Sequence, residues 1–188
     1  MAIRKIRFTI ISFLTLALLL LGFSAGFSMA QELTESEEEL IEHIINVFDS
    51  EPELGMKLLE DLAEENPELA VLVIVELAKE APDKAVIAIV NLVEINPSVA
   101  ARGLVAIGEL FTELAETQPE LAATLKAVLS QSITGMVESG SGRGAGVAAV
   151  VVNSCKQSNP ELGKFLEEEA VAAGLERFYL LAASPIIP

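Results

Sequence analysis

The sequence predicts an all-α protein in which short antiparallel helices form a compact, α-solenoid-like helical-repeat bundle, preceded by a signal peptide. Three observations lead to this prediction. Proline recurs every fifteen residues from Pro52 to Pro97, apolar residues make up 52% of the chain, and small and large apolar residues hold fixed places after each proline. The fourth residue of each unit is small and the eleventh is Leu or Ile: Gly55, Ala70, Ala85, Ala100, and Leu62, Leu77, Leu92, Ile107.

Residues 1–30 have the three parts of a secretory signal peptide. Arg4, Lys5 and Arg7 form a basic start, and an apolar stretch follows. The small residues of the Ser-Met-Ala sequence at 28–30 suit a signal peptidase, so cleavage is expected before Gln31. This pattern predicts export to the periplasm, the cell surface or the extracellular space.

A second interpretation of the same stretch is an uncleaved membrane anchor. Residues 8–30 carry no charge, and about twenty apolar residues suffice to span a bilayer. The chain would then be anchored in a membrane rather than released. N-terminal sequencing of the exported protein separates the two interpretations.

Residues 31–129 are predicted to form the helical repeat domain, in which each proline begins a helix. Proline suits the first helical position because its missing N–H has no partner there in any case. Asn66, Asn96 and Asn159 precede their prolines and are predicted N-caps. A residue before proline avoids helical geometry, so each junction also ends the preceding helix. Helices of about twelve residues, about 18 Å long, are expected to pack as antiparallel neighbours.

Two units are expected to lie at the centre of the bundle. Residues 69–75 and 85–90 contain no polar side chain, and a helix that is apolar all round is buried on every side or lies in a membrane. The units from Pro67 and Pro82 are therefore predicted to be central. More polar helices are expected to flank them.

The repeat pattern stops after Leu129. Residues 130–146 are rich in glycine and serine and are predicted to form a flexible loop. Residues 147–188 are predicted to form C-terminal helices that pack on the repeat domain, with a break near Gly174. Binding surfaces are expected where the repeat is interrupted, namely in the acidic first helices, this glycine-rich loop and the apolar tail at 184–188.

The charge of the chain limits its partners. It has 28 acidic residues against 12 basic ones, and three of the basic ones lie in the signal, which leaves a net charge of −19 after cleavage. Such a surface repels phosphate backbones, so nucleic acid is excluded as an expected partner. A protein partner or self-association is expected instead, and a membrane remains an alternative through residues 8–30.

Cys155 is the single cysteine, so the chain contains no internal disulfide. Its place at the end of an apolar run favours burial as a small hydrophobic residue. The alternative is an intermolecular disulfide through Cys155.

The sequence contains no motif to which catalysis, a cofactor or a metal is assigned. The sequence at 140–145 fits the dinucleotide-binding pattern G-x-G-x-x-A, but no convincing strand precedes it. His43, the single histidine, has no nucleophile motif near it and is interpreted as a solvated helix residue. The acidic runs 37–39 and 167–169 lack the spacing of a calcium loop and are interpreted as solvated faces. No catalytic, cofactor-binding or metal-binding residue is therefore predicted.

From Pro52 to about Leu129 the arrangement is similar in style to tetratricopeptide and HEAT arrays. Two units here make 30 residues and contain no Trp or Tyr, whereas a tetratricopeptide unit has about 34 residues with aromatic anchors. No functional residue is carried over from either family. We expect an exported, non-enzymatic protein with a protein-binding or scaffold role. Membrane association is the alternative, and an enzyme that uses carboxylates alone is a third hypothesis.

Overall fold

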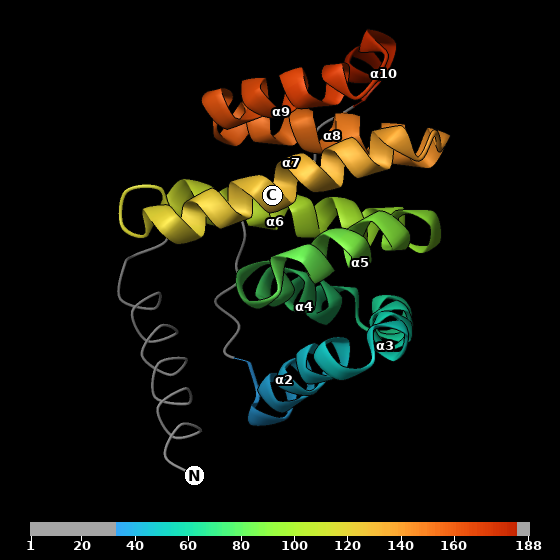
Figure 1. The fold of residues 1–188 in the computed structure, drawn as a ribbon, viewed down its shortest axis with the longest axis vertical. Helices are drawn as coiled ribbons and strands as arrows, with labels where there is room; N and C mark the ends of the chain where they lie inside the picture. Colours follow the sequence, from blue (N-terminus) through green and yellow to red (C-terminus); the bar gives the residue numbers. More distant parts are fainter. Residues whose placement is uncertain (1–32, 184–188) are drawn as a thin grey trace. The chain divides into compact units, whose positions relative to one another are not determined.

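The computed structural model describes residues 33–183, and within them nine helices and no strand are present (Figure 1). The all-α class is therefore confirmed for this part of the chain. The predictions for residues 1–30, for cleavage before Gln31 and for the tail at 184–188 concern residues outside the described range. The helices are α2 (Glu35–Ser50), α3 (Pro52–Glu65), α4 (Pro67–Glu80), α5 (Pro82–Ile95), α6 (Pro97–Leu114), α7 (Pro119–Glu138), α8 (Gly142–Ser158), α9 (Pro160–Ala172) and α10 (Arg177–Ala182).

The predicted helix starts and caps are confirmed. Six helices begin at a proline, and a single residue separates α3, α4, α5 and α6 from one another. The side chains of Asn66, Asn96 and Asn159 accept hydrogen bonds from main-chain N–H groups three residues on, at 3.2, 3.2 and 3.0 Å. The N–H of Asn66 also donates to the carbonyl of Leu62 at 2.7 Å. One residue thus ends α3 and begins α4.

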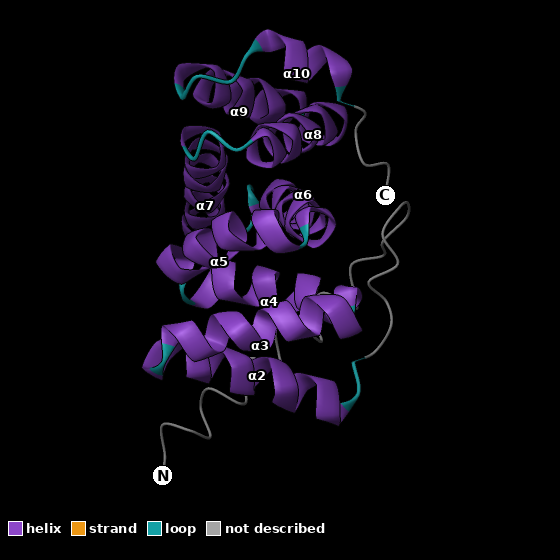
Figure 2. Ribbon diagram, turned by 90° about the vertical axis from the view of Figure 1, so that its right-hand side faces the viewer, coloured by secondary structure: helices purple, strands orange, loops and turns teal. Residues whose placement is uncertain are grey.

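Helices contact their next neighbour and the next but one. Every consecutive pair from α2 to α9 is in contact. The even-numbered helices α2, α4, α6, α8 and α10 also contact in series, as do the odd-numbered α3, α5, α7 and α9. The helices are therefore stacked one after another, and the even-numbered and the odd-numbered helices each form a row (Figure 2).

The four regular units bury the same four positions, counted from the proline. The fourth and eleventh residues are buried, as the spacing predicted, and so are the eighth and twelfth. These four positions lie on one face of a helix. The additional residues are Leu59, Ile74, Ile89 and Leu104 at the eighth position, and Ala63, Ala78, Val93 and Gly108 at the twelfth.

The small fourth residue allows two backbones to approach closely. A Cβ atom added at Gly55 would lie 2.9 Å from the Cα of Phe48 in α2. One added at Gly163, the fourth residue of α9, would lie 2.5 Å from the Cα of Lys156 in α8. At both positions the neighbour is backbone, which no change of rotamer can move away.

The flexible loop predicted over 130–146 is wrong. Helix α7 continues to Glu138 and α8 begins at Gly142, so three residues separate them. Burial of Ile133 and Met136 fixes the end of α7, and burial of this kind overrides the low helix propensity of serine and glycine. The break predicted near Gly174 is confirmed, because α9 ends at Ala172 and α10 begins at Arg177.

The prediction of two central helices is right for α4 and wrong for α5. Helix α4 buries eight of its residues, including Val71 and Val75. In α5, Ile87 is 61% exposed and Ile95 is 46% exposed. An unbroken apolar run does not show which of its faces points outward. No helix between residues 33 and 183 is both long and apolar enough to cross a membrane.

Candidate functional site

The residues singled out from the sequence do not converge on one site. The segment 140–145 follows helix α7 rather than a strand, and it contains the turn into α8 and the first residues of that helix. In this turn the Ser141 hydroxyl accepts hydrogen bonds from the N–H groups of Arg143 and Gly144. The segment therefore lacks the strand that a dinucleotide fingerprint requires. His43 is exposed on α2.

The acidic run 167–169 takes part in contacts between side chains. Glu167 pairs with Lys156 at 2.8 Å, and Glu169 accepts a hydrogen bond from the Ser130 hydroxyl at 2.7 Å. These contacts tie α9 to α8 and α7. Across residues 33–183, no group of three or more His, Cys, Asp or Glu side chains could hold a metal ion.

The burial predicted for Cys155 is confirmed, since the residue is 1% exposed. Burial raises the pKa of its thiol to about 12, and the negative charge of Glu109 adds to the shift. Burial likewise raises the pKa of the Glu109 carboxyl. The pKa of the Glu113 carboxyl is also raised, mainly by burial and to a lesser extent by the negative charge of Glu109. The thiol faces Gly108 of α6 so closely that a Cβ added there would lie 3.0 Å from Sγ. A disulfide with a partner would therefore require α8 to move away from α6.

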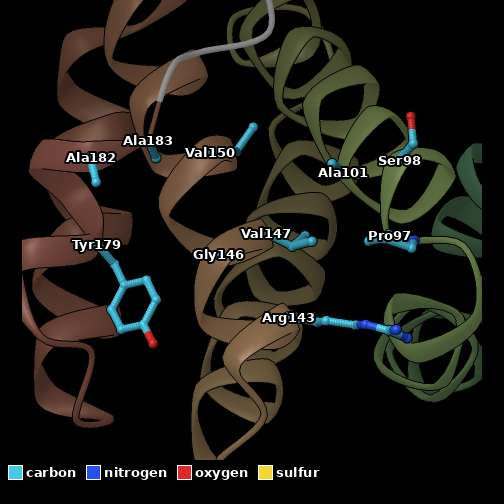
Figure 3. A pocket seen from close by; sticks show the side chains of 10 residues that line it. All are labelled: Pro97, Ser98, Ala101, Arg143, Gly146, Val147, Val150, Tyr179, Ala182 and Ala183. Carbon is cyan, nitrogen blue, oxygen red and sulfur yellow. The ribbon is translucent and has the colours of Figure 1, made fainter.

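A groove with a volume of about 530 Å³ crosses the surface of α8 (Figure 3). Gly146, Val147 and Val150 of α8 lie between Ala101 of α6 on one side and Tyr179 of α10 on the other. The lining is mostly apolar and made of small side chains. Its polar groups are the Arg143 guanidinium and the hydroxyls of Ser98 and Tyr179.

The groove exists because a small residue lies between two fixed walls. A Cβ added at Gly146 would meet no atom within 4 Å, so the space above it is open. The side-chain amide of Asn153 in α8 donates to the carbonyls of Leu180 and Ala183 at 2.8 and 2.9 Å. These bonds, together with the buried Leu180, hold α10 in place on α8.

The groove also contains a cation that no carboxylate neutralises. Arg143 donates to the carbonyl of Glu94 at the end of α5, and it forms no ion pair within the described residues. By contrast, five other basic residues do pair with carboxylates: Lys79, Lys84, Arg102, Lys156 and Lys164. Among residues 33–183, no carboxylate pairs with the remaining N–H groups of Arg143, which can donate to an anion.

Helix α10 extends the apolar surface beyond the groove. Phe178 is 69% exposed and Leu181 is 88% exposed, and the two lie three residues apart on the same side of the helix. Among the described large apolar residues these two are the most exposed. Helix α10 thus contributes Tyr179, Ala182 and Ala183 to the groove and exposes Phe178 and Leu181 to solvent.

The sequence predicted this site only in part. Of the expected binding surfaces, the glycine-rich segment contributes Gly146 to the groove, whereas α10 precedes the tail at 184–188 and was not predicted as a binding surface. The missed signal is the run Phe178–Leu181, because four consecutive apolar residues cannot all face inward from one short helix. Comparison of the chain with protein families, with curated proteins and with solved structures gives no match.

Proposed function

We propose that this chain is an exported, non-enzymatic, acidic helical-repeat protein that binds a protein partner in the cell envelope or outside the cell. The fifteen-residue repeat, the shared buried positions and the contacts between helices two apart support an α-solenoid-like arrangement. Solenoids present extended surfaces to their partners. Export is proposed from residues 1–30, and the alternative of a retained anchor depends on residues 8–30.

The observation that carries the proposal is the exposed apolar side of α10. Full burial of a Phe or Leu side chain stabilises by about 1.5–3 kcal/mol, so Phe178 and Leu181 offer a partner a substantial share of a binding free energy. Terminal repeats of a solenoid need a polar outer face for solubility. The acidic helix α2 meets this need at its end of the series, whereas α10 does not. Exposed apolar surface next to polar surface is typical of protein interaction sites.

A capture experiment with the full chain tests the proposal. A double variant, Phe178→Ser with Leu181→Ser, removes the exposed apolar surface of α10. The matched control, Leu54→Ser with Ile87→Ser, removes two exposed apolar residues of α3 and α5. We expect a partner, identified by mass spectrometry in envelope or medium fractions, to bind the wild type and the control but not the α10 variant. Failure of the wild type to capture any partner contradicts the proposed function, and equal capture by all three proteins contradicts the role of α10 in it.

A further inference from the structure

We propose that the groove over α8 binds an extended, apolar peptide segment of the partner, and that a carboxylate of this segment pairs with Arg143. This inference rests on the proposed function, because it assigns a chemistry to the partner. Tyr179, Ala182 and Ala183 of α10 line the groove, so α10 belongs both to the groove and to the exposed apolar surface. The inference follows from the shape, the charge and the unused hydrogen-bonding groups of the groove.

The shape favours a segment of a larger molecule over a small ligand. Sites for small molecules enclose most of the ligand surface. This groove is open to solvent, and its floor of Gly146, Val147 and Val150 can cover one face of a ligand. An extended chain buries alternate side chains on one face and turns the others outward. The outward face would then be covered by the partner itself.

The charge favours a single carboxylate over a polyanion. Arg143 is the one basic residue that lines the groove, and a planar guanidinium binds a carboxylate through two parallel hydrogen bonds. The rest of the chain is strongly acidic, which repels a nucleic acid or an anionic membrane surface. One carboxylate among apolar residues gains the attraction of Arg143 and meets far less of this repulsion than a polyanion does.

The hydroxyl groups of Ser98 and Tyr179 supply the remaining polar contacts. Neither hydroxyl makes a hydrogen bond within residues 33–183. An extended peptide brings main-chain N–H and C=O groups into the groove, and these groups need partners when they are buried. A hydroxyl can donate to a carbonyl or accept from an N–H, so it suits either group.

The test uses two synthetic peptides and the full-length protein. The first is fluorescein-labelled Gly-Ile-Pro-Ile-Asp-Ile-Pro-Ile-Gly, and the second carries Lys in place of Asp. Fluorescence anisotropy measures the affinity of each. We expect saturable binding of the Asp peptide and at least about tenfold weaker binding of the Lys peptide, since hydrogen bonds to charged groups are among the stronger ones. Arg143→Gln should remove this preference.

A matched pair of glycine variants tests the location. Gly146→Trp fills the groove, whereas Gly142→Trp adds the same side chain to α8 at a residue that does not line the groove. At both positions an added Cβ would meet no atom within 4 Å, so neither side chain clashes at its base. We expect peptide binding to be lost in the first variant and kept in the second, with circular dichroism showing that both fold. Any of three results overturns the inference: equal affinity for the two peptides, unchanged peptide binding by Gly146→Trp, or binding to anionic phosphatidylserine vesicles in place of the Asp peptide.

The two proposals can fail separately. If the α10 double variant loses its partner while Gly146→Trp still binds the Asp peptide as the wild type does, the protein-binding function stands and the assignment of the groove is wrong. If the peptide results hold but the α10 variant captures the partner as the wild type does, the groove stands and α10 is not the surface that binds the partner; if the wild type captures no partner at all, the proposed function is wrong.

Discussion

Alanine substitution at two glycines of neighbouring helices should change stability in opposite directions. Both glycines are helical, so replacing either by Ala adds about 0.5–1 kcal/mol of helix propensity. At Gly146 of α8 the new Cβ meets nothing within 4 Å, and this gain remains. At Gly163 of α9 the new Cβ would lie 2.5 Å from the Cα of Lys156, where ordinary contacts begin near 3.4 Å.

The close contact at Gly163 forces a movement of backbone. To reach an ordinary separation α9 has to shift from α8 by about 1 Å, and overpacking of this kind costs about 1–3 kcal/mol. The shift also disturbs the ion pair between Lys156 and Glu167. We therefore expect Gly163→Ala to lower the free energy of unfolding by about 1–2 kcal/mol, and Gly146→Ala to raise it by up to about 1 kcal/mol.

Urea denaturation followed by circular dichroism measures both effects. The midpoint should fall for Gly163→Ala and rise for Gly146→Ala, with the same slope in both variants. If both variants shift the midpoint in the same direction by similar amounts, the close approach of α8 and α9 is not what requires glycine at position 163.

Three further predictions concern caps and buried ionisable groups. Asn96→Ala removes the N-cap of α6 and a 3.0 Å hydrogen bond to the carbonyl of Ala63. The free energy of unfolding, measured by urea denaturation, should therefore fall by about 1–3 kcal/mol. A fall of less than about 0.5 kcal/mol contradicts this prediction. Because burial raises the folded pKa of Glu109, protonation favours the fold and stability is lost as pH rises through that pKa. Glu109→Gln should therefore gain stability over the wild type as pH rises from about 4 to about 7, and a difference that does not vary with pH argues against it. The Cys155 thiol, buried and with its pKa raised to about 12, should react with a thiol reagent at neutral pH only after denaturant is added; fast labelling of the folded protein would show that α8 is open.

The features that the sequence predicted correctly depend on neighbouring residues. A proline begins a helix because of its own ring, and Asn66 caps α4 through an N–H three residues away. Small residues at the fourth position were recognised because the repeat displays them in register. These properties need no knowledge of the rest of the fold.

The features that the sequence missed depend on contacts between distant helices. Residues 130–146 have the composition of a loop, but Ile133 and Met136 are buried against other helices and extend α7. The outward face of α5 could not be told from its inward face, so the exposure of Ile87 was missed. The groove lies between α6, α8 and α10, and its walls come from residues far apart in the chain.

Photo-crosslinking in living cells tests the central claim most directly. Benzoylphenylalanine placed at Leu181, which is 88% exposed on α10, reports whatever contacts that surface. The same probe at Ile87, which is 61% exposed on α5, is the matched control. A protein-binding role for α10 predicts a discrete covalent adduct with another protein from position 181 and none from position 87. No protein adduct at position 181, or the same adducts from both positions, would contradict it.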